Sequence, residues 1–561
     1  MAPKVAVPQL SAATGRTFSG DCTALPALLA SLNSLGNTTI TSAVTVPAGT
    51  VSGVATGEHC QLIGKMNERV SPVDGATYAI GFEMRAPQNW NGRFFYQANG
   101  GLDGSIGTAA GGIGGGGPSA TALSKGFAVL SSNAGHPTPT PFFGLDPQAR
   151  LDYGYNAVAQ LTPMAKNLVK AVYGKVPDRS YIGGCSNGGR HAMVAASRLG
   201  DQYDGILVGN PGFNLPQAAV AQIWGAQQYA KVATGTTAVS VVASGVAATQ
   251  TFPDIKTAFT TAEMNTVSNA VLARCDALDG AKDGLVSDIQ ACQTSFNLVR
   301  DVPTCTGARD GSCLTTTQQT VLGDVFKGAR NTAGTALYSS FPFDAGINGS
   351  DWRGWKFSYP EARDAGAVAF IFTSPPQTQV KTFAGLPFVM NFNMDTDAPK
   401  IFATSGVYTA SPMSFMTPPN PTNLGTLKNR GAKLMVYHGT SDPVFSFNDT
   451  RNWYEGLAAA NQGDASNFAR LFAVPGMNHC SGGPATDKFD MLDPLVAWVE
   501  GGTAPDSVVA SARGAGAAVV NTGLPANWSA TRTRPLCAWP LVAKYKGSGD
   551  LESASSFSCQ P

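Results

Sequence analysis

The chain has 561 residues, of which 43% are hydrophobic and only 13% are charged, and its formal net charge is +1. This length exceeds one compact domain and predicts one large domain with an insertion. A weakly charged, nearly neutral chain gives no support for binding to nucleic acid or to an anionic membrane. No apolar run approaches the roughly 18 residues that a membrane-spanning helix needs.

The ten cysteines favour an oxidising compartment. Their number is even and none forms a Cys-x-x-Cys pair, which argues against a zinc site. Residues 1–8 lack the apolar core of a signal peptide. Because the cysteines nonetheless argue for export, we expect a secreted or periplasmic protein in which Met1 replaces a removed signal. We also expect a monomer. Four of the five disulfides expected are Cys22–Cys60, Cys275–Cys292, Cys305–Cys313 and Cys537–Cys559.

In chain order, residues 1–80 are typical of short strands and loops, although residues 78–85 alternate like a true strand. Residues 91–101 predict a turn, a buried strand and a Gly-rich loop. The next strand is expected at residues 126–133, and a helix over residues 151–173 leads to the central motif.

That motif is centred on Ser186. Tyr181 and Ile182 indicate the end of a buried strand, and helical spacing of apolar residues begins after His191. Between them, Gly184–Gly188 fits G-x-S-x-G, the nucleophile elbow of α/β-hydrolases. A sharp strand-to-helix turn exposes the serine hydroxyl, and the amide of Asn187 at the helix start points toward a developing oxyanion.

A second oxyanion amide in such folds comes from a loop after an early strand. Gly100 and Gly101 are the candidates, and Gly101 is preferred. The alternative is that the Gly-rich run continuing to Gly117 is only a flexible surface loop.

A core strand is expected at residues 204–211, after which the alternation of strands and helices is lost until about residue 420. It returns with strands near residues 433–439 and 468–474 and a helix at 492–500. The predicted class is therefore α/β, an α/β-hydrolase core with a large inserted lid domain. The expected boundaries are 1–211 and 422–561 for the two parts of the core, and 212–421 for the lid.

A serine hydroxyl needs a base, and the base needs an orienting acid. In α/β-hydrolases the order along the chain is Ser, acid, His. The five histidines are His59, His136, His191, His438 and His479. His191 lies one turn into the elbow helix and should point away, and His438 at a strand end is more typical of a packed core histidine. His479 and Asp442 each follow a strand in a loop, so Ser186, Asp442 and His479 are the predicted catalytic residues.

Two cysteines flank this set. Cys185 precedes Ser186 and Cys480 follows His479. A disulfide between them would hold their Cα atoms within about 7 Å and so bring the serine and the histidine together. Cys185–Cys480 is therefore the fifth expected disulfide.

The Cys-Ser…Asp…His-Cys arrangement resembles the tannase and feruloyl esterase family, and the resemblance extends from Cys22 to Cys559. Its motifs are Gly184–Gly189, Tyr437–Asp442 and Val474–Gly483. The closing segments 532–537 and 545–550 look especially like the family branch that hydrolyses mono(2-hydroxyethyl) terephthalate (MHET) during PET breakdown. The resemblance implies an α/β-hydrolase core, a large lid and hydrolysis of esters of aromatic acids.

The family also binds calcium in its lid, and the matching segment is residues 275–285. The resemblance implies a structural Ca²⁺, since carboxylates in a tight Gly-containing loop suit a hard cation. The implied ligands are the carboxylates of Asp276, Asp279 and Asp283 and the backbone carbonyls of Ala281 and Leu285. Without the resemblance, the segment would equally be a solvated acidic turn.

Two departures bear on the substrate. MHET hydrolases carry Glu after the nucleophile, where this chain has Asn187, and a lid Arg that grips the substrate carboxylate. The corresponding stretch is shorter here and leaves open whether Arg353 or Arg363 takes that place. Trp355 matches the aromatic residue that lines the acyl pocket, and Phe445 matches the one just after the acid, although either could be lid core.

The expected partner is thus a small aromatic ester. Two other interpretations are a lipase-like esterase for aliphatic acyl chains and a catalytically inactive, calcium-stabilised protein that binds carbohydrate or another partner.

Overall fold

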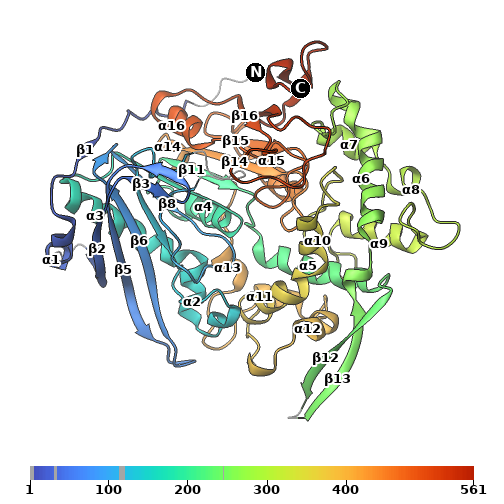
Figure 1. Ribbon diagram of the computed structural model, residues 1–561. Coiled ribbons are helices and arrows are strands. Elements are labelled where there is room, and N and C mark those ends of the chain that lie inside the picture. Colours follow the sequence, from blue (N-terminus) through green and yellow to red (C-terminus); the bar gives the residue numbers. More distant parts are fainter. Residues whose placement is uncertain (1–5, 31–34, 113–119, 244–245, 379) are drawn as a thin grey trace.

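The computed structural model describes residues 6–30, 35–112, 120–243, 246–378 and 380–561. Figure 1 shows a twisted sheet on one side of the molecule and a largely helical region on the other. The N-terminal residues 1–5 and part of the Gly-rich run, 113–117, lie outside the described residues.

A nine-stranded mixed sheet forms the core, in the order β15-β14-β11-β10-β8-β9-β6-β5-β2. The first six strands in this order run parallel, and β6, β5 and β2 continue the sheet antiparallel. The parallel strands are β8 (Arg93–Gln97), β9 (Ala128–Ser132), β10 (Arg179–Cys185), β11 (Gly205–Gly209), β14 (Lys433–Gly439) and β15 (Ala469–Val474). The strands predicted from residue 78 onward are all present.

The expectation for residues 1–80 was wrong in one respect. Besides β2 (Thr38–Val46), this region contains β5 (His59–Val70), a 12-residue strand that pairs along most of its length with the 11-residue β6 (Thr77–Pro87). Polar and glycine residues interrupt the hydrophobic alternation of β5, and it becomes regular only through pairing with β6.

The two faces of the sheet pack against two separate hydrophobic cores, because successive side chains along each strand point to opposite faces. Ile206 and Val208 of β11 face a core that also contains α3 (Ala157–Tyr173), α4 (Asn187–Arg198) and α15 (Phe447–Ala460). Leu207 faces the opposite core, which α16 (Leu492–Gly501) covers. Burial on both faces explains the nearly continuous hydrophobic runs of the parallel strands.

The chain leaves the sheet after β11 and returns at β14, although these strands are direct parallel neighbours. The intervening segment is mostly helical and contains a projecting hairpin (Figure 1). Its main elements are α5 (Leu215–Ala230), β12 (Gly235–Ala243), β13 (Val246–Asp254), α6 (Thr261–Cys275), α7 (Ile289–Ser295), α8 (Leu298–Asp301), α9 (Thr316–Lys327), α10 (Ser350–Phe357), α11 (Ala365–Phe370), α12 (Gly385–Asn391), α13 (Pro412–Met416) and α14 (Gly425–Asn429). The segment thus lies between two neighbouring strands of the core sheet, and it includes α14, which falls after the expected boundary at residue 421.

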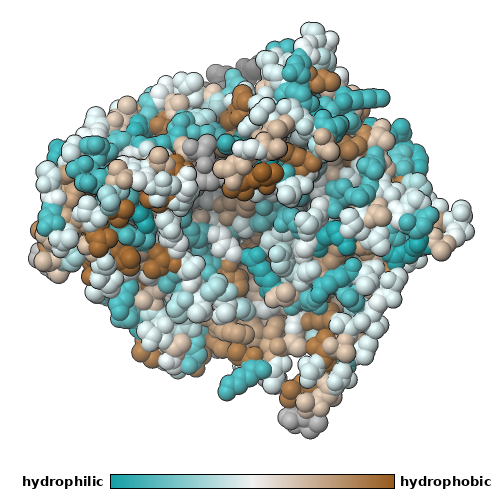
Figure 2. Space-filling view, in the orientation of Figure 1, coloured by the Kyte–Doolittle hydropathy of each residue, from teal (hydrophilic) through white to brown (hydrophobic). Residues whose placement is uncertain are grey.

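After α16 the chain forms two small antiparallel pairs. These are β16 (Ser507–Ser511) with β17 (Thr533–Cys537), and β18 (Val542–Tyr545) with β19 (Phe557–Gln560). Hydrophilic and hydrophobic side chains are interspersed over the face of the molecule shown in Figure 2. Within the ranges given above, no helix combines the length and hydropathy needed to cross a bilayer.

All five expected disulfides are present. They join Cys22 to Cys60, Cys185 to Cys480, Cys275 to Cys292, Cys305 to Cys313 and Cys537 to Cys559.

Candidate active site

Ser186 occupies the sharp turn between β10 and α4. Its backbone has φ 66° and ψ −127°, a conformation that non-glycine residues rarely adopt. The turn is possible because Gly184 and Gly188 lie against the neighbouring strand end, where a Cβ on either would stand 2.3 Å from the carbonyl oxygen of Ala98. This is the strained geometry of a nucleophile elbow, held by close backbone packing on both sides.

The side chains of Ser186, His479 and Asp442 form a continuous hydrogen-bonded chain. Ser186 Oγ is 2.8 Å from His479 Nε2, and His479 Nδ1 is 2.8 Å from Asp442 Oδ2. With the proton on Nδ1 donated to the carboxylate, Nε2 is free to accept the serine hydroxyl proton. The three residues come from three separate loops at the carboxyl ends of β10, β14 and β15, where a parallel sheet gathers them.

Asp442 is buried and held as an anion. Oδ1 accepts hydrogen bonds from the amides of Val444 and Phe445 at 2.9 and 3.0 Å. Oδ2 accepts one from Asn210 Nδ2 at 2.7 Å. Burial alone would raise the pKa of Asp442, but the facing His479, together with His438, holds it well below its ordinary value.

His438 has a wider role than the sequence indicated. It is fully buried, as expected, and it is hydrogen-bonded to Thr450 Oγ1 at 2.9 Å and to the carbonyl of Phe445 at 3.0 Å. Its Nε2 also lies 3.3 Å from Asp442 Oδ2. His438 therefore packs behind the acid and helps to fix the loop that carries it.

His191 points away from the serine, as predicted. Its Nε2 is 2.9 Å from Asp103 Oδ2, beneath the loop that follows β8. Burial, together with the neighbouring Arg190, lowers the pKa of His191 well below its ordinary value.

The Cys185–Cys480 disulfide joins the residues next to Ser186 and His479. The two Cα atoms are 6.2 Å apart. Cys480 has a positive φ of 64°, so the chain turns sharply directly after His479. The crosslink and this turn together limit where the imidazole can lie.

Asp344, from the segment between β11 and β14, was not found from the sequence. Its buried carboxylate accepts hydrogen bonds from the hydroxyls of Thr440 and Ser441 and from the amide of Gly476. It therefore connects the loop that carries Asp442 with the loop that carries His479. Asp344 stands in no motif, and only its burial in the fold reveals this connection.

A narrow cavity opens beside Ser186. Trp355 and Phe445 both line it, and each ring centroid is 5.3 Å from that of His479. The cavity also brings together residues from the loop after β8, the turn before α3, α4, the intervening segment and the loop after β14. They are Gly101, Leu102, Tyr153, Asn187, Leu215, Ala219, Arg363, Asp364, Ala367, Phe372 and Val444. Both preferred oxyanion residues, Gly101 and Asn187, are therefore at its edge.

The structure separates the two arginines that the sequence left open. Arg363 lines the cavity, and its guanidinium lies over the ring of Trp355 at 4.9 Å from the centroid. Arg353 instead donates to the carbonyl of Phe259 at 2.8 Å. Asp364 also lines the cavity, with one buried carboxyl oxygen that has no hydrogen-bond partner. Burial raises the pKa of Asp364 to about 7.

A larger groove, of about 370 Å³, lies between the β12–β13 hairpin and α12. Its lining does not include Ser186, Asp442 or His479. Ser186 instead lines the smaller cavity, which is therefore the candidate active site.

The acidic loop after α6 contains the three aspartates expected to bind calcium. Asp276 accepts hydrogen bonds from the amides of Asp283 and Gly284, and Asp283 is paired with Arg534. Asp279 has a buried carboxyl oxygen without a hydrogen-bond partner. In the described part of the chain, no three His, Cys, Asp or Glu side chains are grouped as a metal site. The unpartnered Asp279 oxygen is nevertheless the kind of group that a hard cation would satisfy.

Comparisons with known proteins all indicate the same family. Residues 60–560 match the family described as tannase and feruloyl esterase. The chain is 41% identical over 544 residues to a mono(2-hydroxyethyl) terephthalate hydrolase from Piscinibacter sakaiensis, covering 91% of this chain and 86% of that protein. It is 26% identical over 529 residues to a probable feruloyl esterase B-1 from Neosartorya fischeri, covering 91% and 87%.

Among solved structures, feruloyl esterase B from Aspergillus oryzae is similar, with a TM-score of 0.72 at 23% identity. The match covers 96% of this chain and 100% of that one. This likeness establishes the α/β-hydrolase-like fold with its large mixed sheet.

Proposed function

The chain belongs to the tannase and feruloyl esterase family and is a carboxylic ester hydrolase, and we propose that it cleaves esters of aromatic acids through Ser186, His479 and Asp442. The observation that carries the proposal is the pair of 2.8 Å contacts that link the three side chains beside a cavity lined by aromatic residues.

In this mechanism Ser186 Oγ attacks the ester carbonyl carbon as its proton passes to His479 Nε2. The tetrahedral oxyanion lies between the amides of Asn187 and Gly101. Its collapse breaks the bond to the alcohol oxygen, which takes the proton from His479. Water then repeats these steps on the acyl-enzyme and releases the acid. Asp442 orients the imidazole and stabilises its protonated form.

Arg363 and Asp364, which are adjacent and both line the cavity, would favour different acyl groups. Arg363 suits an acid with a second, free carboxylate, such as a terephthalate half-ester, because guanidinium pairs with carboxylate in a planar, two-pronged contact. Asp364 suits a phenolic ring, since its unpartnered oxygen can accept a hydroxyl hydrogen bond. We favour the half-ester, because the 41%-identical relative is named as a hydrolase of that ester.

The cavity is narrow, with about 30 Å³ of free space. We infer that lining side chains move apart as an aromatic acyl group binds. Trp355, Arg363 and Asp364 all belong to the segment inserted between β11 and β14. We infer that this segment acts as the lid of the enzyme.

We also infer secretion into an oxidising compartment, since the five disulfides are stable there.

The function is tested by comparing initial rates on MHET, methyl ferulate, methyl gallate and an aliphatic p-nitrophenyl ester. Faster turnover of the aromatic esters supports the proposal, and a preference for the aliphatic ester would favour the lipase-like alternative. Absence of turnover on all four would support a binding protein.

Replacing Arg363 with alanine is expected to lower kcat/KM for MHET by about 10–100-fold, the usual worth of a hydrogen bond to a charged group. The neutral substrate methyl ferulate should change less than about threefold. Arg353→Ala is the matched control, since Arg353 lies on the same segment but does not line the cavity. An equal loss on both esters after Arg363→Ala would contradict carboxylate recognition.

We further propose that the loop 276–285 binds a structural calcium ion through Asp276, Asp279 and Asp283 and the carbonyls of Ala281 and Leu285. Support comes from the unpartnered Asp279 oxygen and from three carboxylates in one short loop. The ion would offset their mutual repulsion, a role that Arg534 fills only for Asp283.

Removing calcium with a chelator is expected to lower the melting temperature while the chemical step is unchanged. A ligand present at a hundredfold over its Kd stabilises the folded state by about 2.7 kcal/mol. Thermal unfolding with and without chelator measures the effect, and Asp279→Ala should abolish it. An unshifted melting curve accompanied by a rapid fall in kcat would contradict a purely structural ion.

A further inference from the structure

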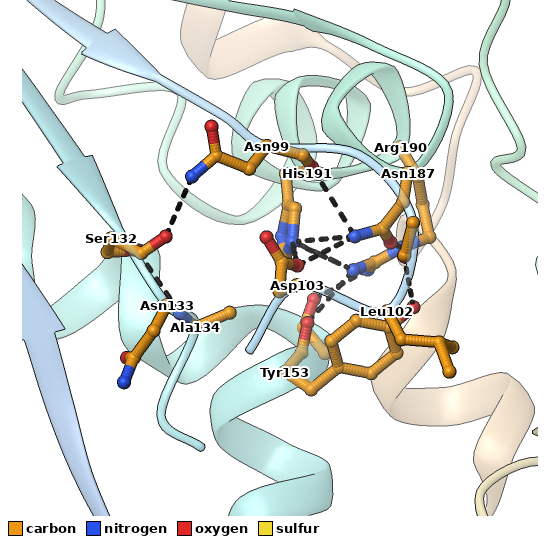
Figure 3. A network of polar contacts seen from close by, with 12 residues as sticks. Asn99, Leu102, Asp103, Ser132, Asn133, Ala134, Tyr153, Asn187, Arg190 and His191 are labelled. Carbon is orange, nitrogen blue, oxygen red and sulfur yellow. Dashed lines mark hydrogen bonds and ion pairs between the residues drawn. The ribbon is translucent and has the colours of Figure 1, made fainter. Parts of the chain in front are cut away.

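A buried polar network lies beneath the proposed oxyanion hole and is not used by the triad. Figure 3 shows Asp103, Asn187, Arg190 and His191 converging between the loop that follows β8 and the start of α4. Each of these four side chains is almost completely buried. Burying this many polar groups is costly unless they are mutually satisfied, so their arrangement calls for an explanation.

The network holds the side chain of Asn187 on both sides. Asn187 Nδ2 donates to Asp103 Oδ2 at 2.7 Å, and Asn187 Oδ1 accepts from Arg190 Nε at 2.7 Å. Arg190 is itself fixed, because its Nη1 and Nη2 donate to the carbonyls of Gly154 and Tyr153 at 2.7 and 2.9 Å. The first residue of α4 thus has its side chain locked, and its backbone amide is the one proposed to donate to the oxyanion.

The loop after β8 is held from the same side. Tyr153 Oη donates to the carbonyl of Gly101 at 3.0 Å, and His136 Nε2 donates to that of Leu102 at 2.6 Å. Asp103 follows at a positive φ of 53°, which few non-glycine residues adopt. From this strained position Asp103 reaches across to Asn187 and to His191, which donates from Nε2 at 2.9 Å.

The two halves of the proposed oxyanion hole are therefore connected. Gly101 lies on the loop after β8 and Asn187 on α4. The Asp103–Asn187 hydrogen bond joins these two elements, together with the His191–Asp103 contact and a longer bond from Asn187 Nδ2 to the carbonyl of Asn99. Asp103 is buried among His136, Arg190 and His191, so its bond to Asn187 is shielded from water. A hydrogen bond is stronger in this low-dielectric interior than in water.

We propose that Asp103 and the side chain of Asn187 are positioning residues, which set the distance between the two oxyanion amides. This inference rests on the proposed esterase mechanism. It assigns Asn187 two roles, one for its backbone amide and one for its side chain, and it explains why an amide rather than a carboxylate occupies this position. A carboxylate at residue 187 would face Asp103 at hydrogen-bond distance and repel it.

The test is a cycle of four variants, each assayed for kcat and KM on a p-nitrophenyl ester. Asp103→Ala should lower kcat about 10–100-fold with KM changed less than about threefold, because oxyanion contacts form mainly in the transition state. Asp103→Asn keeps an acceptor oxygen and should retain most activity. Asn187→Asp should lose at least as much as Asp103→Ala, because it opposes two carboxylates.

The decisive variant is the reciprocal double substitution Asp103→Asn with Asn187→Asp. It again places an amide opposite a carboxylate, with the two groups exchanged. The amide at position 103 can donate to the carboxylate at position 187, and His191 can accept a hydrogen bond from that amide at Nε2. We expect it to recover at least tenfold of the kcat lost in Asn187→Asp. Because the comparison is between two variants at the same positions, it remains informative even if Asp103→Ala folds poorly.

Asp204→Ala is the matched control. Asp204 is also buried and accepts from the amide of Ser180 at 2.8 Å, but it precedes β11 at the opposite end of the strands from Ser186. This variant should lower the melting temperature without changing kcat of the folded enzyme.

Three results would overturn the proposal. They are an unchanged kcat in Asp103→Ala, a rise in KM that accounts for the whole loss, or no recovery in the double variant. Absence of esterase activity in the parent chain would instead contradict the proposed function itself, so the two failures are distinguishable.

Discussion

Replacing Ser186 with alanine is expected to lower kcat by about a millionfold while leaving the fold intact. The variant loses the nucleophile, and the residual rate comes only from the oxyanion site and substrate binding. The φ of 66° that Ser186 adopts does not require the hydroxyl, since the turn is imposed by the close packing of Gly184 and Gly188. Single-turnover assays on MHET, with thermal unfolding in parallel, measure both parts of the prediction.

The matched control is Ser197→Ala. Ser197 lies in the same helix, α4, and its hydroxyl donates to the carbonyl of Pro419, away from the reacting centre. This variant should retain nearly full activity. Retention of more than about one per cent of kcat in Ser186→Ala, after contaminating enzyme has been excluded, would contradict the proposed nucleophile.

The parts of the site that were predicted from the sequence are those encoded by short local patterns. The elbow is a strand, a turn and a helix within 20 residues, so hydrophobic spacing and glycines suffice to place Ser186. Asp442 and His479 each follow a strand, and the carboxyl ends of neighbouring parallel strands meet at one sheet edge. The cysteines beside Ser186 and His479 added a long-range constraint, which the 6.2 Å Cα separation satisfies.

What the sequence did not reveal depends on contacts between distant segments. Asp344 and Asp103 stand in no motif, and each becomes informative only through partners more than 80 residues away. Arg353 and Arg363 could not be told apart from the sequence, because both lie in short helical segments and only the packing of these segments decides which arginine lines the cavity. The long strand β5 was missed because its regularity comes from pairing with β6.

Removing the Cys185–Cys480 disulfide is expected to damage both stability and catalysis. Its cysteines are 295 residues apart, so the crosslink excludes many unfolded conformations and contributes up to about 5 kcal/mol on an entropic model. The double variant Cys185→Ala with Cys480→Ala also frees the loop that carries His479. A misplacement of about 1 Å can cost a hundredfold in rate, so kcat should fall by about 10–100-fold even where the protein is folded.

Cys305→Ala with Cys313→Ala separates these two effects. That disulfide spans only 8 residues in the segment between β11 and β14, and its removal should cost about 2–3 kcal/mol without changing kcat. Denaturant unfolding measures the stability of both double variants, and kcat is compared well below their melting temperatures. The contacts of Asp442 Oδ2 with His479 and of Asp351 with the His479 amide remain in both variants and act over a short range. If those contacts alone fix the imidazole, the Cys185–Cys480 variant will keep full kcat, and the disulfide will prove to stabilise the fold without positioning the base.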